Sequence, residues 1–217
     1  MKSADTKARG ARITRRALLP LALVPMLVRQ AAADKDSALN EPLQALYGSL
    51  EAAMRAGRSA PFAQRFNSIA PAVERAFDLD TILKVSVGLR WNSMDQATQA
   101  ELSKTFRRFT VATYVANFDR YEGERFNVLP GPRPSGNDRV VRTEMVDNKG
   151  NVIRIDYVMR EETGGWRAVD VLLDGSISRV AVQRSDFRTI LANGDAPALI
   201  ASLRRKIADL SEGALSS

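Results

Sequence analysis

The chain of 217 residues contains neither histidine nor cysteine. Without cysteine it forms no disulfide and has no thiolate nucleophile or thiolate metal ligand, and without histidine no imidazole can activate a serine or hold zinc. Most common hydrolase mechanisms are therefore excluded, and we expect no catalytic residue and no metal site. Apolar residues (45%) and charged residues (26%) are near globular averages, which predicts one domain of ordinary size with a detachable end.

The excess of positive charge is confined to the N-terminus. Residues 1–33 carry +6 of the net charge of +7, and the remaining 25 basic and 24 acidic side chains interleave through the chain. A protein that binds nucleic acid is expected to carry its basic residues on the folded domain. We therefore predict no nucleic-acid partner.

The N-terminal segment has the composition of a secretory signal peptide. Residues 2–16 are basic, residues 17–28 are apolar, and alanines occupy positions 31–33. A membrane-spanning helix needs about 20 apolar residues, so the apolar stretch is too short for one. We predict a cleavable signal at residues 1–33, a mature domain at residues 34–217 and a periplasmic location. Residues 14–19 resemble a twin-arginine export signal, and the general secretory route remains open.

The first half of the mature chain has helical periodicity. Leucines and a methionine recur every three or four residues from Leu39 to Met54, up to Gly57. We expect a second helix from Pro61 that Pro71 interrupts, and a short third helix over residues 78–87. A capping box at residues 93–96 predicts a long helix to about residue 121, apolar nearly all round and therefore covered on most sides.

The period changes to two after residue 123, and helical periodicity returns near residue 177. The fold class predicted is α+β: N-terminal helices, a four-stranded antiparallel meander sheet and two C-terminal helices, with an apolar cavity between helices and sheet. On the third strand, we expect Ile153, Ile155, Tyr157 and Met159 to share the dry face. The strands are expected near residues 124–129, 138–146, 152–160 and 166–173, and the last helices over residues 177–191 and 196–210.

Three groups of charged residues are candidate sites. Asp170 and Asp174 could form a general acid–base pair, but no neighbouring side chain completes a mechanism, so we interpret them as hydrogen-bond acceptors at a turn. Asp78 and Asp80 precede an apolar segment and are typical of a helix start. Basic residues 204–206 on the closing helix are typical of a solvated face.

Residues 165–175 and 184–187 resemble the C-terminal signature of the MlaC family, also called the toluene-tolerance family, of periplasmic lipid-binding proteins. Residues 106–121, with the strand segments 141–143 and 155–157, resemble the family's central part, and the resemblance extends over residues 62–210. Residues 174–187 look more like the hopanoid-associated HpnM branch than the phospholipid shuttle. The signature residues are Trp166, Asp170, Gly175, Arg184 and Phe187.

The resemblance implies a non-enzymatic periplasmic carrier. It would shuttle phospholipid or hopanoid, as cargo and without a cofactor, between the inner and outer membranes. Its partners would be an inner-membrane lipid transporter complex of the ABC/MCE type, to which it is the auxiliary component, and an outer-membrane lipoprotein complex. The resemblance implies that such a system would maintain the lipid asymmetry of the outer membrane.

A lipid carrier needs an apolar pocket, and two other functions compete with it. An assembly or accessory factor would have a dry core and no bound lipid, and an enzyme would use Asp170 and Asp174. A pocket of about 300 to 1,000 Å³ would favour the carrier. We predict that the pocket is lined by Phe106, Phe109, Val115, Phe118, Ile153, Ile155, Tyr157, Val171 and Leu173.

Overall fold

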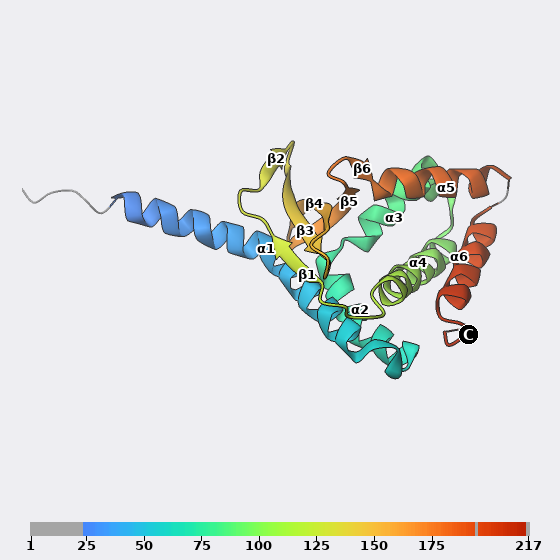
Figure 1. The fold of residues 1–217 in the computed structure, drawn as a ribbon. Coiled ribbons are helices and arrows are strands. Elements are labelled where there is room, and N and C mark those ends of the chain that lie inside the picture. The colour runs from blue at the N-terminus through green and yellow to red at the C-terminus, as the bar shows by residue number, and fades with distance from the viewer. Residues whose placement is uncertain (1–23, 194, 216–217) are drawn as a thin grey trace, which may run out of the picture. The chain divides into compact units, whose positions relative to one another are not determined.

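The computed structural model describes residues 24–193 and 195–215 (Figure 1). Residues 35–217 form one compact unit. The basic region and part of the apolar region of the predicted signal lie outside the described residues, so the signal and its cleavage stay predictions. None of the helices in the described part of the chain has the length and hydrophobicity that crossing a membrane requires.

The first two helices bury leucine, isoleucine and valine side chains. Helix α1 (Val24–Ala56) buries the predicted leucine stripe, and Gly57, at φ +61°, starts the short 3₁₀ turn η1 (Gly57–Ser59). Helix α2 (Phe62–Ala76) continues through Pro71, so the predicted interruption is wrong. Pro71 and the residue four positions before it are both exposed, where water can replace the hydrogen bond that proline removes.

The next two helices start at aspartate caps. The Asp78 carboxylate accepts a hydrogen bond from the Thr81 amide at 2.9 Å at the start of α3 (Leu79–Val87), which confirms the predicted helix start. After η2 (Gly88–Ser93), helix α4 (Gln96–Asn117) begins at Asp95, which accepts the Thr98 amide at 2.8 Å. The predicted capping box at residues 93–96 is therefore wrong, because Asp95 takes the capping role two residues later.

The sheet is antiparallel and has six strands. The order is β1-β3-β4-β5-β6, and β2 pairs with the same edge of β3 as β1 does. The predicted four strands correspond to β1, β3, β4 and β5, whereas β2 and β6 are too short for a period of two to reveal. The strands are β1 (Arg125–Val128), β2 (Arg133–Ser135), β3 (Asp138–Val146), β4 (Val152–Glu162), β5 (Gly165–Leu173) and β6 (Ile177–Ser178).

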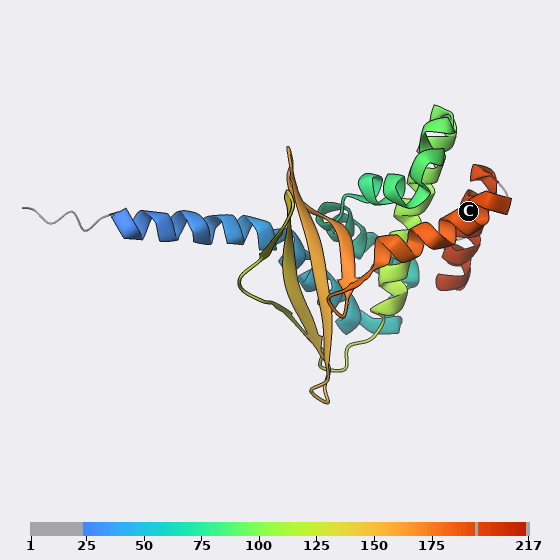
Figure 2. The same ribbon diagram turned by 90° about the horizontal axis from the view of Figure 1, so that it is seen from above.

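Helices cover one face of the sheet. Helices α5 (Arg179–Asn193) and α6 (Ala196–Leu210) close the fold, and Figure 2 shows them with α3 and α4 on one side of the strands. Tyr157 and Met159 of β4 are buried on that side, as the alternation predicts. Ile153 has the same parity but is 44% exposed, because it lies near the open end of the strand.

The opposite face of the sheet contains a buried carboxylate. Asp156 of β4 is 0% exposed. Its oxygens accept hydrogen bonds from Arg154 Nη2 at 2.8 Å and from Arg133 Nη2 at 3.3 Å. Two arginines from different strands therefore compensate the charge and pin β2 and β4 together.

Candidate functional site

A cavity of about 480 Å³ lies between α4 and the sheet, with α3 and α5 at its sides. Its wall is mainly apolar. The lining residues are Phe77, Leu79, Ile82, Phe106, Phe109, Thr110, Thr113, Tyr114, Asn117, Phe118, Ile155, Tyr157, Asp170, Val171, Leu173, Arg179, Val180 and Gln183.

Helix α4 supplies the helical wall from one of its faces. Phe106, Thr110, Thr113 and Asn117 recur at steps of three or four, so they lie on the same side of the helix. The hydroxyls of Thr110 and Thr113 donate to the carbonyls one turn earlier, at 3.0 and 2.8 Å. These hydroxyls are therefore satisfied within the helix and need no partner in the cavity.

Two neighbouring strands supply the opposite wall. Ile155 and Tyr157 of β4 pair with Leu173 and Val171 of β5, which places the four side chains in one patch. The register between β4 and β5 shifts at a bulge between Val158 and Met159, just beyond this patch. The pairing explains why both strands contribute alternate residues to the same wall.

Buried hydroxyls lie behind the patch. The Tyr47 hydroxyl is 2.6 Å from Thr143 Oγ1 and donates to the Tyr157 hydroxyl at 3.3 Å, and Thr143 is also hydrogen-bonded to the Ile155 carbonyl. Burial raises the pKa of Tyr47 and raises the pKa of Tyr157 well above its ordinary value. Burial likewise raises the pKa of Tyr114 in the cavity wall. The three phenols stay neutral and add no charge to the wall.

The charged residues of the cavity are Asp170 and Arg179, and they differ in their bonding. Asp170 accepts hydrogen bonds from the Val180 amide at 3.1 Å and from the Ser178 hydroxyl, which fastens the start of α5 to β5. Asp174 is exposed, with φ +51°. The interpretation of Asp170 as a hydrogen-bond acceptor is confirmed. Arg179, the first residue of α5, is exposed and has no ion pair among the described residues.

Seven of the nine predicted pocket residues line the cavity, and two do not. Val115 is fully buried on the opposite side of α4, where Arg65 Nη1 donates to its carbonyl at 3.1 Å. Ile153 is exposed, as described above. The prediction is wrong for these two positions, and contact with a ligand stays a prediction for the other seven: Phe106, Phe109, Phe118, Ile155, Tyr157, Val171 and Leu173.

Sequence reasoning missed the polar residues of the wall and the contribution of α3 and α5. The steps from Phe106 through Thr110 and Thr113 to Asn117 could have identified the cavity face of α4, because they form one helical stripe. No comparable signal marks Arg179, whose position follows from the packing of α5.

The five signature residues lie at different places in the fold. Phe187 is buried and meets Phe106 edge to face, with ring centroids 6.3 Å apart, while Trp166 packs on the core and Arg184 lies beside Gly88. Gly175 has φ +70°, and a Cβ there would lie 2.8 Å from Cζ of Arg154. Of these residues only Asp170 reaches the cavity itself.

The described residues form no cluster of acidic side chains that could hold a metal ion.

Comparison with curated proteins finds no matching sequence. Among solved structures, the chain is similar to a phospholipid-binding protein from Ralstonia solanacearum in complex with a phospholipid, with a TM-score of 0.69 and 16% identity, over 82% of this chain and 98% of that chain. This likeness shows a shared fold. Residues 45–205 match the family model of the MlaC protein, and the chain therefore belongs to the MlaC family.

Proposed function

We propose that this protein is a non-enzymatic lipid carrier that shields acyl chains in the cavity between α4 and the sheet. The observation that carries the proposal is the cavity of about 480 Å³, with an apolar wall built by helices and strands. Its volume lies within the range of about 300 to 1,000 Å³ that is typical of ligand sites. The phospholipid in the structurally similar Ralstonia protein supports the same cargo class here.

The physical need for a carrier is large. Exposing an acyl chain of about 15 methylenes to water costs about 12 kcal/mol, at about 0.8 kcal/mol per methylene. A cavity removes most of this cost and requires no nucleophile, metal or cofactor. The cavity also disfavours the alternative of an assembly factor with a dry core.

The place of the carrier in the cell is also part of the proposal. The signal at residues 1–33 would deliver the domain of residues 34–217 to the periplasm. There it would exchange lipid with an inner-membrane transporter complex and with an outer-membrane lipoprotein complex, between which it shuttles. Membership in the MlaC family supports these partners.

Bound lipid can be detected directly. We expect the full chain, expressed in a bacterium and purified without detergent, to show a stoichiometric lipid adduct in native mass spectrometry. Thr113→Trp should lower the adduct at least about fivefold, because the indole occupies part of the cavity. Ala100→Trp, at an exposed position of the same helix, is the matched control and should keep the adduct. A protein that stays free of lipid after incubation with phospholipid and hopanoid vesicles would contradict the carrier.

Arg179 favours a phosphate-bearing cargo over a hopanoid. It is the one basic residue on the cavity wall of the described chain, and a phosphodiester there would form charge-assisted hydrogen bonds. We expect Arg179→Gln to reduce the preference for phospholipid over diacylglycerol about tenfold in vesicle competition. Arg188→Gln, exposed on the same helix, should leave the preference unchanged. If Arg179→Gln and Arg188→Gln prefer phospholipid over diacylglycerol equally, residues other than Arg179 select the cargo.

A further inference from the structure

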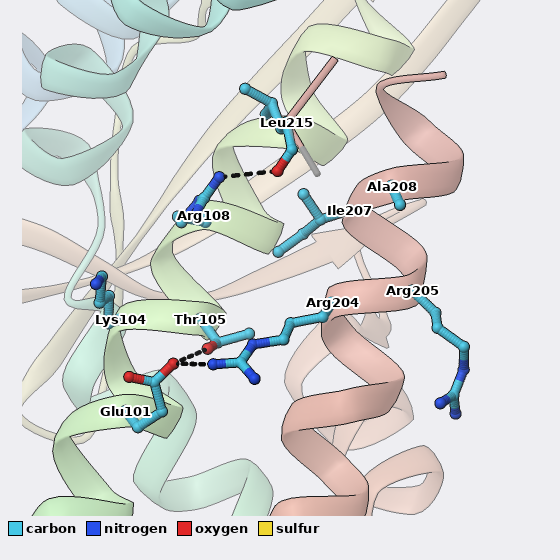
Figure 3. A pocket seen from close by; sticks show the side chains of 9 residues that line it. All are labelled: Glu101, Lys104, Thr105, Arg108, Arg204, Arg205, Ile207, Ala208 and Leu215. Carbon is cyan, nitrogen blue, oxygen red and sulfur yellow. Dashed lines mark hydrogen bonds and ion pairs between the residues drawn. The ribbon is translucent and has the colours of Figure 1, made fainter. Parts of the chain in front are cut away.

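A second cavity, of about 520 Å³, lies between α4 and α6 (Figure 3). We call it the α4–α6 cleft. With about 3.6 residues per turn, its α4 residues lie on the side of that helix opposite the lipid cavity. The cleft is therefore separate from the site described above. It is lined by Glu101, Lys104, Thr105, Arg108, Arg204, Arg205, Ile207, Ala208 and Leu215.

The cleft concentrates positive charge. Four of its lining residues are basic and one is acidic, whereas residues 34–217 as a whole contain 25 basic and 24 acidic residues. Arg204 Nη2 is 2.5 Å from Glu101 Oε1, so the acid is already paired. Lys104 and Arg205 are exposed on the two helices and have no ion pair among the described residues. In Figure 3 Lys104 lies on the side of α4 away from α6 and Arg205 extends away from α4, so these cations lie along the outer borders of the cleft.

The two ends and the floor of the cleft differ in chemistry. The Arg204–Glu101 pair bridges the helices at one end, and Arg108 Nη2 donates to the Leu215 carbonyl at 3.0 Å at the other end (Figure 3). Between them lies Ile207, which is 4% exposed. A ligand in the cleft would meet a small apolar floor between two bonded arginines, with Lys104 and Arg205 at the outer borders.

We propose that the α4–α6 cleft binds an acidic polypeptide segment of a partner protein. Guanidinium groups pair with carboxylates in a bidentate geometry, and the floor suits the apolar part of a chain segment. A bilayer surface is flat, so it would contact the edges of the α4–α6 cleft without filling its interior. Because the cleft and the lipid cavity use opposite sides of α4, a docked segment leaves the cavity free for cargo.

The test uses a fluorescently labelled hexaglutamate peptide as the probe. We expect the full chain to bind it in anisotropy titrations, and Lys104→Glu/Arg205→Glu to weaken binding at least about tenfold. Arg90→Glu/Lys149→Glu, which makes the same charge change at exposed positions elsewhere, should bind within about twofold of the natural chain. Unchanged thermal unfolding of both variants would show that they fold.

Three results would overturn the proposal. The first is that the natural chain does not bind the peptide at millimolar concentration. The second is that both double variants lose peptide binding equally, which would indicate nonspecific electrostatic attraction to the whole protein. The third is a natural chain that binds phosphatidylglycerol vesicles but not the peptide, together with loss of vesicle binding in Lys104→Glu/Arg205→Glu. That outcome would assign the cleft to a lipid surface.

Discussion

Replacing Phe106 by alanine is expected to lower the free energy of unfolding by about 4 kcal/mol. The side chain is 2% exposed and lies between the lipid cavity and the ring of Phe187. Its removal would extend the cavity into the core and would break the edge-to-face contact. Because helices α4 and α5 meet at this pair, the loss should affect unfolding of the whole domain.

The measurement is a guanidinium chloride titration of delipidated protein, since bound lipid would add its own stabilisation. Phe106→Leu removes less of the side chain than alanine does and is the control, with an expected loss of about half that of the alanine variant. A loss below about 1 kcal/mol for the alanine variant would show that the wall collapses into the space, contrary to expectation.

Arg154→Ala is expected to cost about 3 kcal/mol, because it leaves the Asp156 carboxylate buried with one arginine in place of two. Asp156 is 0% exposed, and the remaining contact, from Arg133 Nη2, is 3.3 Å long. Arg154 supplies two of the donors to this carboxylate and its own side chain is 47% exposed, so water entering after its removal replaces part of the lost bonding and keeps the cost at the lower end of the range for a broken buried pair. The variant should therefore unfold at lower denaturant concentration.

An ion pair between β4 and β3 gives the control. Arg160 binds Asp138 through both Nε and Nη2 at 2.9 Å, in the same bidentate geometry, but Asp138 is partly exposed. Arg160→Ala should cost below about 1 kcal/mol, as exposed ion pairs do. Equal losses in the two variants would mean that burial of Asp156 does not decide the cost.

Much of the secondary structure was predictable because long segments have one unambiguous period. The leucine stripe of α1 and the alternation in β3 and β4 are examples, and both lie where expected. The errors occur where two local signals compete. Asp95 and Ser93 are both good caps, and the side chain of Ser93 instead donates to the Arg90 carbonyl at 2.8 Å.

The site was harder to predict than the fold. Helix α4 is apolar nearly all round, so periodicity alone does not tell which side faces a cavity and which side faces other helices. Val115 was placed on the wrong side for this reason. Thr113 and Asn117 line the cavity, and a pattern of apolar residues does not identify them because they are polar.

The neutral hydroxyls behind the cavity bear on how cargo leaves it. Burial keeps the phenols of Tyr47, Tyr114 and Tyr157 protonated, and the chain has no histidine to titrate near neutrality. A modest acid or alkaline shift around neutral pH therefore has no switch to act on in this wall. For the proposed carrier we therefore expect contact with a receiving molecule, rather than a change of pH near neutrality, to release the lipid.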